Sequence, residues 1–317
     1  MTAGEIEFRR YRVGDELAIL EAAYGGTTSD RSLDEWSWLY PGFPLPRAIS
    51  LAVRGDEIVA VIGGRRVAFS DGDRLVPAVV VRERFCRLDD PGESASTARR
   101  LSEHFVAEMT AEDYAVLAFD SDLGVTDAVT RSSSMAVLRR DPAAAAAGRR
   151  LGYRVELARD WEPRLDELWI RARPAGVGSV VRDATYAVQW VAAHPWRRFQ
   201  SFLIFPRFGG SAVAWLVLEC RNGICRWADV LVDPRHPEAV ALAARLSAGV
   251  AQQSSATDEE VVLAGNPEMI EALERAGFRR VEDRKIELSA VGLEWPPDLV
   301  LTAADFGDCL HEGETAW

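Results

Sequence analysis

The spacing of apolar and polar positions is most informative between residues 259 and 288, where it predicts a strand, a helix and a second strand. Residues 259–264 form a short apolar run that contains β-branched valines, and Gly265 follows it directly. A run of this length, bounded by glycine, is typical of a strand inside a sheet. Because strand and helix alternate here, the pattern favours a mixed fold of the α/β or α+β class.

Residues 266–277 carry the start and stop signals of a helix. Asn266 is a favourable N-cap, and the proline that follows it costs no hydrogen bond at the first helical position. The next apolar residues recur at helical spacing. Gly277 is the residue type expected after the last helical turn, and Phe278 is expected to pack back beneath the helix.

The order of predicted elements is nearly the same in the two halves of the chain, which indicates a degenerate internal duplication. Each half begins with a helix and continues with an aromatic helix that ends at proline, a β-hairpin, a further strand, an amphipathic helix and a short apolar strand. In the first half these elements are expected at residues 14–23, 33–44, 49–64, 75–85, 94–109 and 114–120. In the second half they are expected at residues 161–173, 184–195, 200–219, 225–234, 237–253 and 259–264.

The duplication predicts two domains. We assign the first domain to residues 1–141 and the second to residues 151–317. The alanine-rich joint between them, residues 142–150, is expected to be a short helix or a linker. Apolar periodicity fades after Leu301, so the end of the chain is expected to be irregular and to lie on the surface or fray.

Tryptophans recur in the two aromatic helices and just after them, at positions 36, 38, 190 and 196. Large aromatic side chains are more often buried between elements than used as ligand contacts, so we expect packing roles for all four. Their repeated placement supports a shared fold in the two halves and does not by itself predict a binding site.

The formal net charge is -12, which argues against a nucleic-acid partner because such partners require a basic surface. An acidic surface attracts a cationic or amine-bearing acceptor, although it also serves simple solubility. No apolar stretch reaches the ~18 residues that a transmembrane helix needs. The first residues lack the apolar core of a secretory signal. We therefore expect a cytoplasmic protein without a membrane partner.

The chain has four cysteines and four histidines, and neither set shows the spacing of a metal site. Cys220 and Cys225 flank the turn at Asn222 and Gly223 and are expected to face each other across a hairpin. In a cytoplasmic protein they are expected to be reduced thiols. The sequence therefore predicts neither a metal ion nor a disulfide.

Three stretches together resemble the GNAT superfamily of N-acetyltransferases. In that superfamily an asparagine at a helix start precedes a Gly-Phe pair, and Asn266, Gly277 and Phe278 keep the family spacing. The other two stretches are the helix exit at residues 35–44 and the segment at residues 181–190. The chain thus resembles the tandem GNAT proteins common in actinobacteria. The resemblance implies two GNAT-like domains, each a mixed, splayed central sheet flanked by helices.

The resemblance also implies an activity, the movement of an acyl group from a thioester to an amine by direct attack. The donor is a coenzyme A thioester, either acetyl-CoA or a longer acyl-CoA, or an acyl group on an acyl-carrier protein. The acceptor is a small-molecule or peptide amine. In the family the pantetheine arm adds to an open strand edge between two splayed strands. The pyrophosphate lies at the N-terminus of the helix that follows.

Candidate site residues follow from the matching positions. A general base is expected on the fourth strand of each half, at Glu83 or Asp229, or at the end of the fifth strand at Asp120. In the alternative interpretation Glu83 and Asp229 only point outward from their strands, and Asp120 only caps a helix. The donor would be bound by residues of the fourth strand, the loop after it and the last helix start, which are Val80, Val81, Arg87, Gly92, Glu93, Ser94 and Asn266.

Both pyrophosphate loops depart from the family pattern. The first half keeps Arg87 and Gly92 but adds Asp89, Asp90 and Glu93, whose charge opposes a phosphate. The loop of the second half has no glycine, and its two prolines remove backbone donors. The first half is therefore the better candidate for the donor site.

The last helix of the second half also departs from the family. A tyrosine that protonates the leaving thiolate in many members is replaced there by Leu273. Cys86 lies near the loop of the first half, but no histidine is near it in sequence, so we do not expect a covalent intermediate.

These departures leave three interpretations open. The first is an N-acyltransferase, and the alternative is a catalytically decayed GNAT-like protein that binds or acts as a scaffold. The third is another reaction on the same fold, such as aminoacyl transfer from tRNA or decarboxylation of an acyl-CoA, although an acidic surface disfavours tRNA. A carrier-protein donor would need a basic landing surface, and the arginines at positions 139, 140, 149 and 150 form either that surface or an ordinary solvated face.

Overall fold

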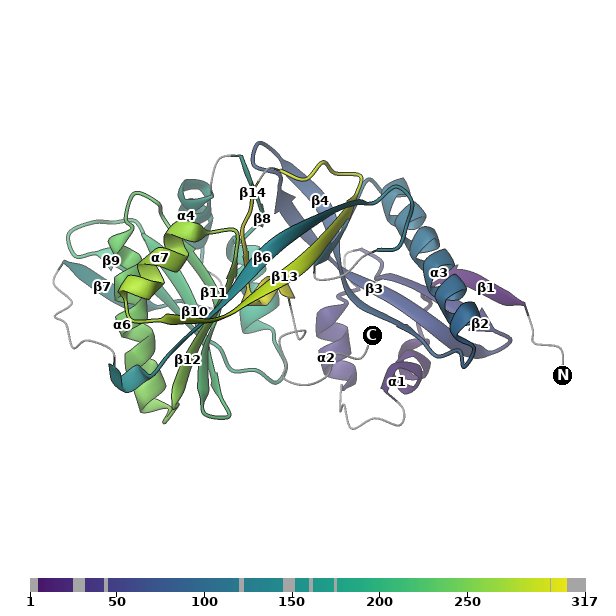
Figure 1. Ribbon diagram of the computed structural model, residues 1–317, viewed down its shortest axis with the longest axis horizontal. Helices are drawn as coiled ribbons and strands as arrows, with labels where there is room; N and C mark the ends of the chain where they lie inside the picture. The colour runs from purple at the N-terminus through teal and green to yellow at the C-terminus, as the bar shows by residue number, and fades with distance from the viewer. Residues whose placement is uncertain are drawn as a thin grey trace.

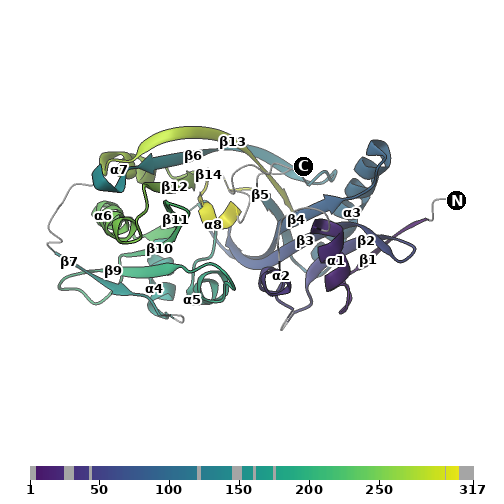
Figure 2. The same cartoon turned by 90° about the horizontal axis from the view of Figure 1, so that it is seen from below.

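The protein has two lobes joined by two long strands that run through both of them (Figure 1). The computed structural model describes residues 5–24, 32–42, 45–119, 123–144, 152–159, 162–173, 176–296 and 298–306. Sheet strands form the middle layer of each lobe, and helices cover its faces (Figure 2).

The first half contains the predicted elements in the predicted order. They are β1 (Ile6–Arg10), α1 (Glu16–Tyr24), α2 (Leu33–Leu39), β2 (Ala48–Arg54), β3 (Glu57–Ser70), β4 (Leu75–Cys86), α3 (Pro91–Ala111), β5 (Ala115–Phe119), β6 (Val129–Arg140) and the short helix η1 (Pro142–Ala144). Helix α3 begins earlier than predicted because Asp90 is its N-cap and Pro91 its first residue. The aromatic helix is shorter than predicted and ends at Leu39.

The second half repeats this order. Its elements are β7 (Tyr153–Leu157), α4 (Arg164–Ala172), β8 (Val177–Val180), α5 (Ala184–Tyr186), η2 (Ala187–Ala192), β9 (Gln200–Pro206), β10 (Ala214–Arg221), β11 (Ile224–Val232), α6 (Glu238–Gln253), β12 (Asp258–Ala264), α7 (Pro267–Arg275), β13 (Arg279–Val291), β14 (Asp298–Leu299), β15 (Leu301–Thr302) and α8 (Ala303–Phe306). The aromatic helix of this half continues from α5 into η2 as a π-helix. Helix α7 begins as predicted, because the Asn266 side chain accepts a hydrogen bond from the Met269 N–H at 3.0 Å.

All strands belong to one sheet in which the two halves exchange their last strands. The main path runs β1-β2-β3-β4-β5-β13-β6-β12-β11-β10-β9-β7. Strand β13 of the second half pairs with β5, as in Leu288 opposite Phe119. Strand β6 of the first half pairs with β12, as in Val137 opposite Val262. The predicted domain boundary near residue 141 stays a prediction. Strands from both sides of it pair with strands of the other half, β6 with β12 and β13 with β5.

The core lies on both faces of this sheet. One cluster joins the two lobes and includes Val80 and Leu117 from the first half and Trp190 and Trp215 from the second. Others lie beneath α3 and α6 and between α1, α2 and the first hairpin. The packing expected for Trp36, Trp38 and Trp190 is confirmed. The expectation for Trp196 is wrong, because this side chain is largely exposed.

The prediction of reduced thiols at Cys220 and Cys225 is also wrong, since the structure joins them in a disulfide. The predicted hairpin is the cause. Asn222 and Gly223 both have positive φ, 51° and 79°, as a two-residue hairpin turn requires. The turn places the two cysteines directly opposite each other on β10 and β11, with their Cα atoms 4.0 Å apart.

Candidate active site

Strands β4 and β5 of the first half start side by side and then separate. They form three parallel residue pairs, the last of which joins Val80 to Leu117. From Val81 onward β4 has no pairing with β5 among the described residues and is held only by β3. Val80 and Val81, which we predicted to bind the donor, therefore lie at the point where the strand edge opens.

A β-bulge lies at the same point. Gly63 of β3 is opposite Glu83 and Gly64 is opposite Val81, so Arg82 is the extra residue of β4. A bulge of this kind bends the strand and redirects the side chains after it. It is the interruption that allows the two central strands to separate, as the family resemblance implied.

Glu83 is the first residue beyond the bulge and does not point outward to solvent. Its side chain lies within the protein, with 8% of the residue exposed. The Tyr40 hydroxyl donates a hydrogen bond to Oε2 at 2.9 Å. The interpretation of Glu83 as an ordinary outward carboxylate is therefore wrong.

Gly63 makes room for this arrangement. A Cβ atom at this position would lie 2.8 Å from the Tyr40 ring, closer than such contacts occur. The ring therefore packs directly on the backbone of β3, which places its hydroxyl over the residue opposite, Glu83.

The second half repeats the bulge and the carboxylate. Strands β11 and β12 form four parallel pairs that end at Trp227 and Val261. Ala228 is the bulge residue, and Asp229 follows it in the position that Glu83 has on β4. Asp229 is 1% exposed and accepts a hydrogen bond from the Tyr186 hydroxyl at 2.7 Å. The interpretation of Asp229 as an outward carboxylate is wrong as well.

A charged network surrounds Asp229. Arg182 donates to it at 2.7 Å and also pairs with Asp305. Burial lowers the pKa of Arg182, but the charges of Asp229 and Asp305 outweigh this and raise it. Burial, with the charge of Asp229, raises the pKa of Tyr186 well above its usual value. Asp229 thus serves to balance a buried arginine.

Residues 301–306 fill the gap between β11 and β12. Strand β15 pairs with β12, with Leu301 opposite Ala264 and Thr302 opposite Leu263. Asp305 then accepts hydrogen bonds from Arg182 and from the backbone N–H of Thr302. The expectation of an irregular surface segment after Leu301 is wrong for residues 301–306, because they form a strand and a helical turn within the protein. The free edge of the second half is therefore occupied by the chain itself.

The loop before α3 has its own carboxylate at the helix start. The Asp90 side chain accepts a hydrogen bond from the Glu93 N–H at 2.7 Å, and the Glu93 carboxylate pairs with Arg54. Gly92 and Ser94 lie in the first turn of the helix, although the sequence placed Gly92 in the loop before it. Arg87 donates to the backbone oxygen of Glu21 at 3.2 Å. The site that would hold a pyrophosphate is thus partly used by the protein's own acid groups.

The structure brings together only some of the predicted residues. Val80, Val81 and Glu83 share one stretch of β4, and the loop residues follow on the same chain segment. Asn266 lies in the second half, beside the gap that β15 fills. Asp120 lies outside the described residues. Their roles in catalysis and donor binding stay predictions.

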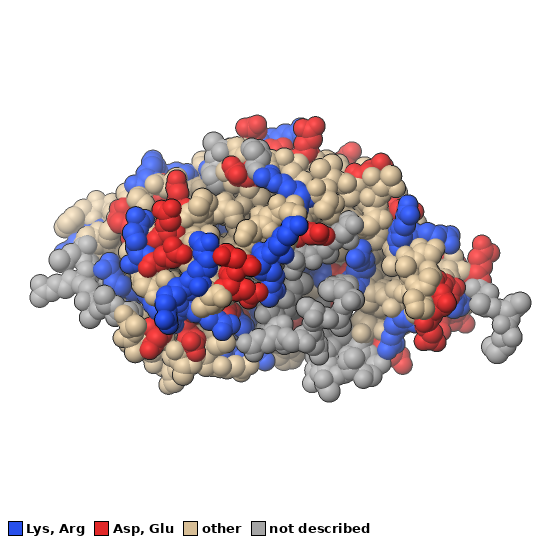
Figure 3. Space-filling view, in the orientation of Figure 1, with Lys and Arg blue, Asp and Glu red and all other residues tan. Residues whose placement is uncertain are grey.

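The prediction of a basic landing surface for a carrier protein is wrong for Arg140. Arg140 is buried and pairs with Glu259, and Arg139 pairs with Glu260. Arg149 and Arg150 lie outside the described residues. On the face over β6 and β13, basic and acidic side chains alternate without a continuous basic area (Figure 3).

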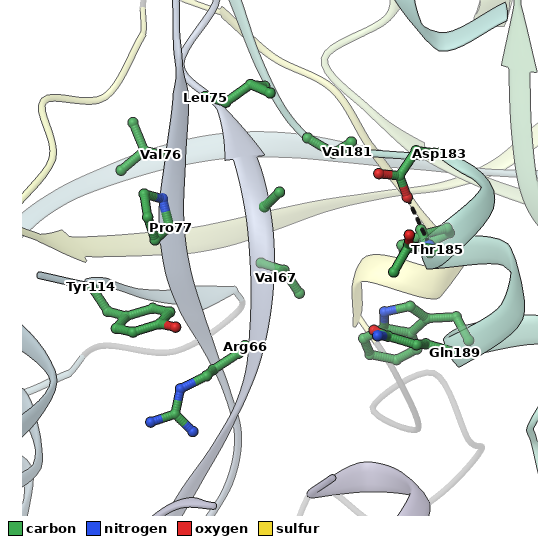
Figure 4. Close-up of a pocket in the computed structure, with 13 residues that line it drawn as sticks. Arg66, Val67, Leu75, Val76, Pro77, Tyr114, Val181, Asp183, Thr185 and Gln189 are labelled. Carbon is green, nitrogen blue, oxygen red and sulfur yellow. Dashed lines mark hydrogen bonds between the residues drawn. The ribbon is translucent and has the colours of Figure 1, made fainter. Parts of the chain in front are cut away.

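A cavity of about 400 Å³ lies between the lobes. Glu83 and Tyr40 are not among the residues that line it. Figure 4 shows Val67, Val76 and Pro77 of the first half on one side and Asp183, Thr185 and Gln189 of the second half on the other. Trp190 also lines it. Because the cavity needs both lobes, no pattern within one half of the sequence predicts it.

Two residues of this region, Tyr40 and Arg65, were not predicted as site residues. Tyr40 is part of the aromatic segment at residues 35–44, but its contact with Glu83 depends on the fold. Arg65 follows the glycine pair in β3 and is adjacent to Arg66, and a pair of arginines after an apolar run was an available signal.

No helix in the described part of the chain is long and apolar enough to cross a bilayer. Within the same residues, no three or more His, Cys, Asp or Glu side chains are grouped as metal ligands would be.

Comparison with family models of sequence gives no match. Comparison with curated protein sequences gives none either. Solved structures do resemble the chain. One is a conserved protein of Enterococcus faecalis described as a probable N-acyltransferase, with a TM-score of 0.69 and 7% identity over 90% of this chain and 72% of that one.

Two other similar structures share the fold. N-myristoyltransferase of Saccharomyces cerevisiae, solved with bound myristoyl-CoA and inhibitors, has a TM-score of 0.60 and 10% identity over 93% of this chain and 82% of that one. A tandem GNAT protein from the clavulanic acid biosynthesis pathway has a TM-score of 0.55 and 16% identity over 92% of this chain and 100% of that one. At these identities the likeness concerns the fold, and this chain therefore has the GNAT fold, with two GNAT-like units in tandem.

Proposed function

We propose that the protein is an N-acyltransferase whose first half binds the acyl thioester and carries out the transfer. The observation that carries this proposal is the edge of β4 from Val81 onward, which no strand in the described part of the chain pairs with on the side of β5. This edge lies directly beside the buried carboxylate of Glu83. An extended thioester arm binds to such an edge through backbone hydrogen bonds. The names of the similar structures, which include N-acetyltransferases and an N-myristoyltransferase, support the same reaction class.

The donor site is assigned to the first half because the corresponding strand edge of the second half is already occupied. Strand β15 occupies the edge of β12, and Asp229 balances Arg182. A thioester arm would have to displace both. In the first half the described residues place no such strand against β4.

Glu83 is the proposed general base. An amine attacks a thioester carbonyl only when it is neutral, and the nitrogen must then lose a proton. A carboxylate held by the Tyr40 hydroxyl is fixed in direction, which favours proton transfer from a positioned amine. The proton passes to Glu83 as the C–N bond forms, and the thiolate leaves with the carrier group. Cys86 takes no part in this direct transfer.

The donor is proposed to be acetyl-CoA, a longer acyl-CoA or an acyl-carrier protein, and the acceptor a small-molecule or peptide amine. The residues present fit the pantetheine arm better than the pyrophosphate. Asp90 already caps α3, and Glu93 adds a second carboxylate at that helix start. We therefore propose that most of the binding free energy of the donor comes from the arm.

Calorimetric titration with acetyl-CoA and with free pantetheine tests this proposal. We expect both to bind with one site per chain and with similar affinities. If both titrations are silent, the alternative gains support, namely a decayed GNAT-like binding or scaffold protein. The occupied helix start at Asp90 is the observation that favours that alternative.

A further inference from the structure

Arg65 is a buried arginine that has no acidic partner among the described residues. Only 1% of the residue is exposed, and within that part of the chain its Nε and Nη1 atoms have no hydrogen-bond partner. Its Nη2 atom donates a hydrogen bond to the backbone oxygen of Gln189 at 2.9 Å. Buried charges are normally paired, because an unpaired charge loses its hydration without compensation. Two other deeply buried arginines of the described chain, Arg140 and Arg182, both have carboxylate partners.

Aromatic rings surround the Arg65 guanidinium instead. Its central carbon lies 3.8 Å from the ring centre of Trp190 and 4.9 Å from that of Trp38. Trp38 in turn donates to the same Gln189 oxygen at 2.7 Å. Ring faces attract a cation, but this attraction is weaker than a buried ion pair. Arg82 lies over the Trp190 ring as well, at 4.6 Å, so a second positive charge is near.

The electrostatic state agrees with this geometry. Burial, followed by the charge of Arg82, lowers the pKa of Arg65 to about 9. An anion beside the guanidinium would relieve both effects.

Arg65 lies between the cavity and Glu83. Side chains two residues apart on a strand share a face, so Gly63, Arg65 and Val67 of β3 lie in one row. Val67 lines the cavity, and Gly63 is opposite Glu83. Each step along this row is roughly 7 Å. Gln189 and Trp190, which contact the Arg65 guanidinium, also line the cavity, so Arg65 lies directly behind its wall on the side of Glu83.

We propose that Arg65 binds the carboxylate of the acceptor, and hence that the acceptor is an amine that also carries an acid group. This inference rests on the proposed function, in which the amine of the acceptor lies beside Glu83. The carboxylate would accept hydrogen bonds from Arg65 Nε and Nη1, the two unpaired atoms. The separation along β3 selects acceptors whose amine and carboxylate are several bonds apart.

Thermal unfolding with three matched compounds tests the proposal. 6-Aminohexanoate carries both groups, hexanoate only the acid and hexylamine only the amine. Sodium chloride at equal ionic strength is the reference. We expect 6-aminohexanoate to raise the Tm of the wild-type protein by roughly 3 °C or more at saturation. We expect a smaller rise with hexanoate and none with hexylamine.

Two variants assign the effect to Arg65. Arg65→Met should remove the response to 6-aminohexanoate, and Arg65→Lys, which keeps the charge but not the two donor atoms, should lose most of it. Arg99→Gln on the outer face of α3, where the arginine side chain is 62% exposed, is the control and should respond as the wild type does.

The following results would overturn the proposal. They are no response of the wild type to either acid, an equal response of Arg65→Met, and an equal rise with hexylamine. A rise with hexanoate that 6-aminohexanoate does not exceed would show a free-anion site and contradict the assignment to an amine acceptor. Donor titration is a separate measurement, so silent acetyl-CoA and pantetheine titrations beside a positive acid response would refute the acyl transfer and leave the anion site standing.

Discussion

At the scale of single residues, the account depends on the carboxylate that follows each bulge. Glu83 and Asp229 occupy the same place in the two halves, and each accepts a hydrogen bond from a tyrosine hydroxyl. Asp229 is also tied to Arg182 by a buried ion pair. The same position thus serves two purposes, one proposed to be chemical and the other structural.

Glu83→Gln should reduce the turnover of acyl transfer by a factor on the order of 100 or more, because the amide cannot take the proton. The hydrogen bond from Tyr40 is kept by the amide oxygen, so stability and donor binding should change little. Steady-state kinetics of thiol release, with donor binding measured in parallel, checks this. Turnover close to that of the wild type would remove Glu83 from the mechanism. Cys86→Ala is the matched control and should remain active.

Gly63→Ala tests how the residue opposite Glu83 positions Tyr40. The added methyl group would meet the ring at 2.8 Å, so the ring must move. Overpacking of this kind costs roughly 1–3 kcal/mol of stability. Urea unfolding should show that loss, and turnover should fall together with it. Gly249→Ala on α6, where a Cβ meets nothing within 4 Å, is the control.

At the scale of elements, the two halves differ in the segment of residues 301–306 (β15 and α8), called the tail below, which pairs with β12. Asp305→Asn weakens the partner of Arg182 within a buried network. Removing one partner of a buried pair typically costs about 3–5 kcal/mol, so the asparagine variant should lose a substantial part of that. Chemical denaturation measures the loss. Acetyl-CoA binding at the first half should be unchanged, and a loss of binding in a folded variant would show that the tail takes part in the donor site.

The loop between β11 and α6 gives a pH dependence. Hydrogen bonds from Arg235 outweigh burial and lower the pKa of Asp233 to about 2 from 3.8. A carboxyl whose pKa is lower in the folded protein stabilises it above the unfolded pKa and loses this effect as pH falls. The contribution of Asp233, roughly 2 kcal/mol, should be complete at pH 6 and should disappear between about pH 4 and pH 2.

Urea unfolding of the wild type and of Asp233→Asn at several pH values measures this contribution. The stability difference between the two proteins should shrink across that interval. A difference that stays constant from pH 6 to pH 2.5 would contradict the assignment.

Element order was predictable because it depends on local patterns. Asn266, Gly277 and the prolines mark helix ends through backbone geometry, and apolar spacing marks the strands. The bulge at Arg82, the pairing of β15 and the buried state of Glu83 depend on contacts between distant segments. The disulfide follows from the hairpin geometry, which Asn222 and Gly223 already indicate in the sequence, and not from the expected compartment of the protein.

At the scale of the whole molecule, the strand exchange makes the halves interdependent. Strand β13 lies between β5 and β6, so residues 1–141 alone lack the neighbour that joins their last two strands. We expect residues 1–141 and residues 142–317 to be unfolded or aggregated when made separately and to form a native complex when made together. Circular dichroism and cooperative thermal unfolding check this. A cooperatively folded fragment of residues 1–141 would contradict it.

The two-lobed shape also explains why the candidate site was only partly predictable. The row from the cavity through Arg65 to Glu83 uses β3 and β4 of the first half together with Gln189 and Trp190 of the second. No motif within one half reports a site that both halves build. The family resemblance implied the open edge, and the exchange of strands and the filled second half required the structure.

Hydrogen–deuterium exchange with and without acetyl-CoA distinguishes a donor site in the first half from one in the second half. We expect the backbone amides of residues 81–86 on β4 to become protected when acetyl-CoA is added, and those of residues 228–232 on β11 to stay unchanged. Protection confined to the second half, or no protection in either half at saturating acetyl-CoA, would contradict it.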